Sequence, residues 1–474
     1  MNKYKHLISN TMLFAISTFS SKLLVFLLMP LYTRVLSPED YGAYDIVVNT
    51  CILIIPIMTL TVHEAVVRFG MDKGEKKSDV LSTALCTIFI GYIILWALYP
   101  LLNRIQIIQG YLPLIYLYVL TSALRSSITQ FVRICGSVRL FAIDGIFTTL
   151  VTVGLNVLLL VYFKMGPTSL ILSTILADAF SALSLFLILR LHRFVKIKGI
   201  NKTTVRSMLR YSTPLMPTAI SWWVTNISDR YFVAYMLGLS INGLYSAAYK
   251  IPTLITQVSA IFIQAWQLSA FEEYQNKEGE RFYSTIFKCY YTFVFLLASL
   301  IILLVKPIIH LMTGRPEYFE AWRFVPFLVL AVSFSCLVTF LGTIYNAVKK
   351  NTMVTVSSII GAGTNIGLNA LLIPQMGANG AALATFISFF LVFCIRAIDT
   401  RKYMNLHMQP LRIIANLLLL LLQVWASLSE FKYWVLCEVI VFVLLVACNF
   451  GYILFMLRKL YTLLPWVKRR ESHI

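Results

Sequence analysis

The sequence predicts an all-α membrane protein with 14 transmembrane helices, two six-helix lobes related by a parallel repeat plus two C-terminal helices. Three observations predict this class. The 474 residues are 59% hydrophobic and only 13% charged, whereas a soluble globular chain averages about 25% charged residues. Apolar runs long enough to cross a bilayer recur from end to end. Lys and Arg gather in alternate connecting segments, as membrane topology requires.

Fourteen apolar segments follow one another along the chain. Lys3 and Lys5 precede the first, which is too long for a cleaved signal peptide and is expected to remain as an anchor. The segments span about residues 10–33, 42–69, 79–102, 112–134, 144–163, 169–190, 211–237, 243–271, 284–306, 321–346, 354–374, 378–398, 411–429 and 433–457. We expect the basic stretch 191–208 to lie on the inner membrane surface, attracted by anionic lipid headgroups.

The distribution of cations predicts the orientation. With the N-terminus inside, 28 Lys and Arg fall in cytoplasmic stretches and seven on the opposite side, so both termini are expected in the cytoplasm. The cations of the cytoplasmic stretches explain the net charge of +20. Nucleic acid is not an expected partner, because no extramembrane domain is expected that could bind it. Topology leaves five cations unexplained: Lys22, Arg68, Arg125, Arg230 and Lys250.

The chain also contains an internal repeat. Residues 154–159 (GLNVLL) recur at 367–372 (GLNALL), and the turn 36–44 is echoed at 237–245. Six segments separate the copies, and an even number predicts a parallel repeat about an axis along the membrane normal. The expected domains are an N-lobe with its cytoplasmic linker at 1–200, a C-lobe at 201–405, and the last two helices with a basic tail at 406–474. Transporters of this kind bind substrate between the halves, near the midplane.

The unexplained cations are not scattered. Lys22, Arg68, Arg230 and Lys250 lie on segments 1, 2, 7 and 8, which correspond to one another in the repeat. A charge near the bilayer centre costs roughly 2.5–3.5 kcal/mol, so these residues either pair or line a pathway. The fifth cation, Arg125, is expected to pair with Asp178.

Segments 7 and 8 each carry a polar stripe at helical spacing, which lipid does not tolerate. We therefore expect both stripes to face a water-filled or protein-lined interior. Their members are Thr218, Ser221, Thr225 and Ser228–Asp229 in segment 7, and Ser246, Lys250, Thr253, Gln257 and Gln264 in segment 8.

Two charge pairs leave two interpretations open. Glu64 and Arg68 are four residues apart, so they either neutralise each other on one helix face or contact a ligand directly. Asp229 and Arg230 pose the same choice, but adjacent helix positions point about 100° apart, which favours Arg230 beside the polar stripe. A guanidinium there can bind a phosphate with two parallel hydrogen bonds.

No catalytic, metal or cofactor site is predicted. His63-Glu64 does not begin an HExxH motif, because position 67 is valine, and no P-loop appears. The eight cysteines are scattered without a CxxC pair, so they are expected to be small core residues.

Five motifs in order carry a resemblance to a known family. They are the turn 36–44 (LSPEDYGAY), Arg68-Phe69, residues 211–217 (YSTPLMP), residues 229–232 (DRYF) and residues 243–250 (GLYSAAYK). Together they resemble the Wzx-type lipid-linked oligosaccharide flippases, the polysaccharide transporter branch of the multidrug/oligosaccharidyl-lipid/polysaccharide (MOP) superfamily. The resemblance covers the whole chain.

The resemblance implies a multi-pass protein of the bacterial cytoplasmic (inner or plasma) membrane that works by alternating access without a cofactor. The implied cargo is an undecaprenyl-diphosphate-linked oligosaccharide, the precursor of O-antigen, capsule, teichoic acid or a similar cell-surface polysaccharide. The implied partners are this lipid-linked saccharide, membrane lipids, and the polysaccharide polymerase and glycosyltransferases. The expected substrate-binding residues are Lys22, Glu64, Arg68, Asp229, Arg230 and Lys250.

Two other functions remain open. A multidrug or cation exporter of the same superfamily should show unpaired acids in its lobes, and of Glu64, Asp178, Asp229 and Glu438 the first and third have cations nearby in sequence. A membrane glycosyltransferase or polymerase generally needs a sizeable outside loop with acid/base residues, and the longest one here, near 306–323, is short. Segments 13 and 14 are almost uncharged, which suits contact with a lipid tail.

Overall fold

The computed structural model describes residues 28–72, 74–196, 200–273, 279–348, 350 and 352–463. Every regular element in these ranges is a helix, which confirms the all-α class. Ten helices of this part of the chain are long and apolar enough to cross a membrane. The total of fourteen stays a prediction, and most of the first predicted segment, with Lys22, lies outside the described residues.

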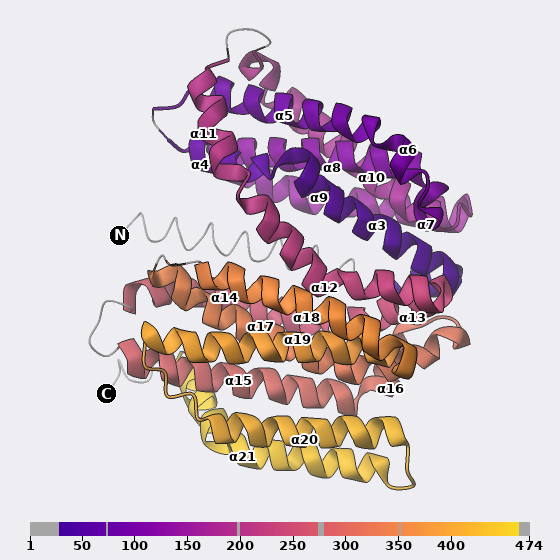
Figure 1. Cartoon of the computed structure of the whole chain (residues 1–474), viewed down its shortest axis with the longest axis vertical. Coiled ribbons are helices and arrows are strands. Elements are labelled where there is room, and N and C mark those ends of the chain that lie inside the picture. The colour runs from indigo at the N-terminus through magenta and orange to yellow at the C-terminus, as the bar shows by residue number, and fades with distance from the viewer. Residues whose placement is uncertain are drawn as a thin grey trace, which may run out of the picture. The chain divides into compact units, whose positions relative to one another are not determined.

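The chain divides into two compact units, shown in Figure 1. The first contains the chain up to Ser246 together with Met312–Tyr318. Its helices are α2 (Met29–Val35), α3 (Pro38–Thr59), α4 (Val62–Gly70), α5 (Lys77–Ala97), α6 (Tyr99–Leu102), α7 (Gln106–Gln109), α8 (Leu112–Ile134), α9 (Val138–Val157), η1 (Leu158–Tyr162), α10 (Pro167–Ile188), η2 (Leu191–Phe194), α11 (Lys202–Ser212), α12 (Leu215–Leu237) and the start of α13 (Leu239–Lys250).

The second unit contains Ala247–Leu311 and the chain from Phe319 onward. Its helices are the end of α13, α14 (Thr253–Glu273), α15 (Gly279–Leu303), most of α16 (Val305–Met312), most of η3 (Pro316–Phe324), α17 (Val325–Val348), α18 (Thr352–Met376), α19 (Ala378–Asp399), η4 (Thr400–Lys402), α20 (Pro410–Ser429) and α21 (Trp434–Leu463). The boundary between the two units along the chain thus falls within α13, whereas the repeat divides the chain near residue 200. The lobe boundaries drawn from the repeat stay a prediction.

Two predicted segments are interrupted. Residues 42–69 form two helices, because Leu60 and Thr61 adopt left-handed backbone angles with φ of 48° and 51°. Residues 243–271 contain the end of α13 and α14, separated at Ile251-Pro252. Proline has no N–H to donate, so the helix cannot continue through it without losing a hydrogen bond.

The local sequence explains where α3 begins. Ser37 is its N-cap, and the Asp40 N–H donates to Ser37 Oγ at 3.2 Å, while the Ser37 N–H donates to Asp40 Oδ2 at 3.3 Å. This reciprocal pair satisfies two donors that a helix start otherwise leaves without partners. Pro38 occupies the first helical position, where its missing N–H costs nothing.

Glycines at matching positions of the repeat adopt the same backbone conformation. Gly166 precedes α10 with φ 60° and ψ −145°, and Gly377 precedes α19 with φ 62° and ψ −145°. Residues with a Cβ rarely adopt these angles. The Met-Gly pair therefore recurs because both halves need the same reversal before their sixth segment.

Helices α20 and α21 lie side by side at one edge of the second unit (Figure 1) and pack on α15. Buried amides join the three helices. Asn449 Nδ2 donates to Asn416 Oδ1 at 2.8 Å, Thr292 Oγ1 donates to Asn449 Oδ1 at 3.2 Å, and Ser299 Oγ donates to Gln423 Oε1 at 2.7 Å. Such hydrogen bonds join helices where lipid supplies no hydrophobic driving force.

Candidate functional site

An ion pair joins two helices of the first unit at Arg230. Arg230 Nη1, on α12, donates to Asp45 Oδ1, on α3, at 2.7 Å. The two side chains are only 11% and 7% exposed. Because a charge removed from water is tolerated when an opposite charge and hydrogen bonds compensate it, this pair is what permits both residues within apolar helices.

Asp229 points to a different partner. Its Oδ2 accepts a hydrogen bond from the Tyr245 hydroxyl at 2.6 Å, and its Oδ1 accepts one from the Arg230 backbone N–H at 2.9 Å. The side chains of Asp229 and Arg230 thus diverge, as adjacent helix positions should. We call Asp45, Asp229, Arg230 and Tyr245 the Arg230 centre.

The ion pair belongs to a longer polar seam between α3 and α12. The Trp223 indole N–H donates to the Asn49 carbonyl at 2.9 Å. The Tyr231 hydroxyl lies 2.6 Å from Thr50 Oγ1 and donates to the Ile46 carbonyl at 3.2 Å. These contacts, which we call the α3–α12 seam, hold α12 in the first unit although the repeat assigns it to the second half.

Three hydroxyls of the segment 7 polar stripe form hydrogen bonds within their own helix. Hydroxyls of Ser221, Thr225 and Ser228 donate to carbonyls four residues earlier, at 2.6–2.9 Å. Each hydroxyl oxygen keeps the capacity to accept another hydrogen bond. Thr225 and Ser228 are buried, whereas Ser221 is half-buried.

A second charged cluster lies between α8, α9 and α10. Arg125 donates from Nη1 to Asp178 Oδ1 at 3.3 Å and from Nη2 to Asp144 Oδ2 at 3.4 Å. Its Nε donates to Ser181 Oγ at 3.0 Å, and that hydroxyl donates to Asp144 Oδ1 at 2.6 Å. Ser122 donates to Asp178 Oδ2. The expected Arg125–Asp178 pair is confirmed, and we call these five residues the Arg125 centre.

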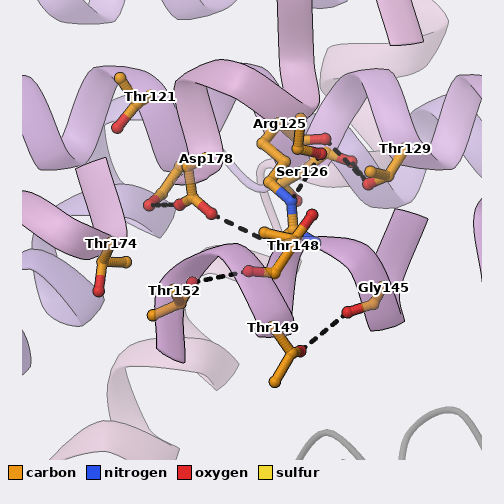
Figure 2. A network of polar contacts seen from close by, with 12 residues as sticks. Thr121, Arg125, Ser126, Thr129, Gly145, Thr148, Thr149, Thr152, Thr174 and Asp178 are labelled. Carbon is orange, nitrogen blue, oxygen red and sulfur yellow. Dashed lines mark hydrogen bonds and ion pairs between the residues drawn. The ribbon is translucent and has the colours of Figure 1, made fainter. Parts of the chain in front are cut away.

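Figure 2 shows how this centre is built. Arg125 reaches from α8 toward Asp178 and toward the side of α9 that carries Thr148. Thr148 is buried and donates to Asp144 Oδ1 at 3.5 Å, while Thr129 donates to the Arg125 carbonyl at 2.9 Å. One guanidinium thus forms ion pairs with two carboxylates, and neighbouring hydroxyl groups form hydrogen bonds with both carboxylates.

Glu64 and Arg68 lie apart from both centres, on α4. Glu64 Oε1 lies 3.5 Å from His63 Nε2, and no ion pair joins Glu64 to Arg68 in this part of the structure. Arg68 is exposed on α4. Of the two interpretations of these residues, the one in which Glu64 and Arg68 neutralise each other is therefore wrong. Lys250 is the half-buried last residue of α13.

Sequence reasoning missed five buried charges among the described residues: Asp45, Asp79, Asp144, Arg396 and Asp399. Asp45 and Asp144 lie about two turns into α3 and α9. Arg396, counted among the cytoplasmic cations, is 5% exposed and donates to Ser357 Oγ at 3.0 Å and to the Val338 carbonyl at 3.1 Å. The signal available for Asp45 and Asp144 was a carboxylate flanked on both sides by apolar residues.

Each unit also has an apolar groove on its surface. In the second unit, α14, α15 and α21 border a groove of about 850 Å³ lined by Ile261, Phe262, Tyr290, Phe293 and Phe455, among others. In the first unit, α3 and α5 border a groove of about 450 Å³ beside the α3–α4 break. The composition of the larger groove suits a hydrocarbon chain rather than a polar ligand.

Similar solved structures are transporters. An inward-facing multidrug resistance MATE family transporter of the MOP superfamily aligns with a TM-score of 0.67 at 12% identity, covering 81% of this chain and 95% of that one. The lipid II flippase MurJ, in an inward closed conformation, aligns with a TM-score of 0.65 at 15% identity, covering 95% of this chain and all of that one. At these identities the likeness shows the fold alone.

Sequence comparison shows the family. No curated protein sequence matches the chain. The model of the polysaccharide biosynthesis protein family, however, matches residues 7–267, more than half of the chain. The match includes α3, α12 and α13, which carry the Arg230 centre. The chain therefore belongs to the polysaccharide biosynthesis protein family and has the fold of the MOP superfamily.

Proposed function

We propose that this chain is a flippase that translocates an undecaprenyl-diphosphate-linked oligosaccharide across the bacterial cytoplasmic membrane by alternating access. The cargo would be a precursor of O-antigen, capsule, teichoic acid or a similar surface polysaccharide. The observation that carries the proposal is the Arg230 guanidinium, only 11% exposed, within apolar helices of a polysaccharide biosynthesis protein. A diphosphate that crosses an apolar slab needs such a group in place of its hydration.

The residues proposed to contact the headgroup are Lys22, Glu64, Arg68, Asp229, Arg230 and Lys250. Arg230 has the strongest support, because its planar fork can bind two phosphate oxygens at once. The hydroxyls of the segment 7 stripe would accept or donate hydrogen bonds to sugar hydroxyls.

The lipid tail would use the larger apolar groove. Its wall includes Phe455 of α21, one of the two helices that the sequence places outside the repeat. The MurJ alignment covers 95% of the chain and the MATE alignment 81%, a difference that two additional helices would produce. This supports a cargo with a long hydrocarbon chain.

The orientation and the partners are part of the same proposal. Both termini would lie in the cytoplasm, with lobes at 1–200 and 201–405 and the two further helices at 406–474. Glycosyltransferases would supply the cargo on the inner face, and a polysaccharide polymerase would receive it on the outer face.

A multidrug or cation exporter is the second candidate, and one observation favours it. In the Arg125 centre two buried carboxylates face one guanidinium, so the cluster carries a net negative charge when both acids are ionised. A cationic substrate or coupling ion would be attracted to such a site. The exporter would explain this cluster, and the Arg230–Asp45 pair would then only join α3 to α12.

Reconstitution separates the two functions. The full-length protein is placed in liposomes that contain a fluorescent polyprenyl-diphosphate disaccharide, and the label reaching the opposite leaflet is measured by chemical quenching. Parallel liposomes are loaded with ethidium. A flippase moves the labelled lipid faster than protein-free liposomes do and leaves ethidium inside. Ethidium efflux without lipid movement would assign the chain to the exporters.

A further inference from the structure

We propose that Asp45 is the resident counter-ion of Arg230, which the phosphate of the substrate displaces during loading. The inference rests on the proposed function and adds a positioning residue that the sequence did not reveal. Asp45 Oδ1 accepts from Arg230 Nη1 at 2.7 Å, so a phosphate that binds this nitrogen must compete with a carboxylate already in place.

The hydrogen bonding of Asp45 is that of a counter-ion that another anion can replace. Only one of its oxygens is used: Oδ2 is buried and has no hydrogen-bond partner among the described residues. A buried carboxylate with a permanent structural role normally has both oxygens satisfied. Asp178 shows this in the Arg125 centre, where Oδ1 accepts from Arg125 and Oδ2 accepts from Ser122.

The chemistry favours exchange over simple neutralisation. Guanidinium binds carboxylate and phosphate through the same fork, so one anion replaces the other without rebuilding the site. A phosphate diester or diphosphate brings at least as much negative charge as Asp45. Arg230 therefore stays compensated at every stage, and the site is never left with an unpaired buried cation.

Exchange at Arg230 would also loosen the α3–α12 seam. The ion pair is the charged contact of that seam, and the remaining ones at Trp223, Thr50 and Tyr231 are neutral hydrogen bonds. Charge-assisted contacts are about twice as strong as neutral ones. Substrate loading would thus remove the strongest contact between α3 and α12 and couple binding to movement of α12.

The test uses the purified full chain and farnesyl diphosphate as the probe, with binding measured by calorimetry at fixed ionic strength. Asp45→Asn removes the competing charge at nearly constant size, so its Kd should fall about tenfold. Arg230→Ala should lose binding. The matched control is Asp79→Asn, because Asp79 is also a buried, ion-paired aspartate of the first unit, but its partner is Lys196 at 3.2 Å. Its Kd should equal that of the unchanged protein.

Each outcome decides between the claims. An unchanged or weaker affinity of Asp45→Asn, with binding lost in Arg230→Ala, overturns the counter-ion assignment and leaves the phosphate site standing. Full binding by Arg230→Ala overturns the phosphate site itself. If Asp45→Asn folds only in the presence of farnesyl diphosphate, the probe replaces the missing counter-ion, as the inference predicts. Failure to fold in its presence as well contradicts the inference. In transport, the inference predicts that Asp45→Asn lowers KM and kcat together.

Discussion

Gly42 and Gly243 pack backbone against backbone, and they occupy equivalent positions in the sequence repeat. A Cβ added to Gly42 would lie 2.0 Å from the Leu239 carbonyl oxygen, and one added to Gly243 would lie 1.8 Å from the Pro38 carbonyl oxygen. Pro38 and Leu239 are themselves equivalent, so the contact is self-complementary. Asn242 Nδ2 donates to the Gly42 carbonyl at 3.1 Å and fixes the crossing of α3 with α13.

Gly42→Ala should separate these helices and destabilise the protein. The Leu239 carbonyl cannot move away from the new methyl group without unwinding the start of α13. We therefore expect the free energy of unfolding to fall by about 1–3 kcal/mol, as overpacking of a core produces. Thermal unfolding in detergent measures it. The control is Gly154→Ala, because a Cβ there meets nothing within 4 Å. Equal unfolding temperatures for the two variants would show that the crossing is not a tight contact.

Arg125→Ala should lower protein abundance. It leaves Asp144 and Asp178 buried near each other without the cation that they share, and an orphaned buried charge costs about 3–5 kcal/mol. Adding Asp178→Asn should restore part of the loss, whereas the exposed Arg104→Ala should have no effect. Immunoblotting of membranes measures abundance. Normal abundance with lost transport would instead place the Arg125 centre in the substrate or ion pathway.

Asn449→Leu should weaken the attachment of α20 and α21 to α15. The substitution leaves Asn416 and Thr292 without their shared partner, and interhelical hydrogen bonds in membranes are worth about 0.6–2 kcal/mol. The expected result is a lower unfolding temperature. Cys448→Leu is the matched control, since Cys448 is the exposed neighbour on the same helix. A shift as large in the control would assign the effect to helix α21 as a whole and not to the amide contacts.

Reporter fusions test the orientation. Fusions after Gly110, Gly314 and Phe431 should report the outside, and one after Gly199 the inside, because the cationic stretches stay in the cytoplasm. The readout is the ratio of alkaline phosphatase to green fluorescent protein activity at each position. An outside signal at Gly199 would overturn both the orientation and the parallel repeat.

Composition and periodicity were sufficient to predict the all-helical membrane fold. The Arg125–Asp178 pair followed only from matching two oppositely charged residues within apolar segments. The breaks within segments were not predicted, because periodicity continues across them. Neither Leu60 nor Thr61 is a residue type that favours the left-handed conformation, so the sequence gives no sign of that break. The break after α13 does have a sequence signal, Pro252. Apolar patterns specify which residues avoid water, but not where one helix ends and the next begins.

The sequence pattern was also insufficient to predict the partners of Glu64 and Arg230. Helical spacing suggested Glu64 with Arg68, whereas the structure places Glu64 beside His63. The partner of Arg230 is Asp45, a contact that only the packing of α12 on α3 creates. Spacing along one helix predicts which residues share a face. Partners on different helices depend on tertiary packing, which the sequence pattern alone does not contain.

The most direct measurement for the central claim is glycan export by the double variant Asp45→Asn, Arg230→Ala in cells that lack the unchanged chain. Arg230→Ala alone is expected to abolish export, but it also leaves Asp45 buried without its partner. The double variant removes both charges and should reach normal abundance, while Arg230→Lys should retain part of the export. If Arg230 binds the phosphate, the double variant is present in the membrane and exports no glycan. Export restored to the level of the unchanged protein would show that the pair is structural and contradict the phosphate-binding assignment.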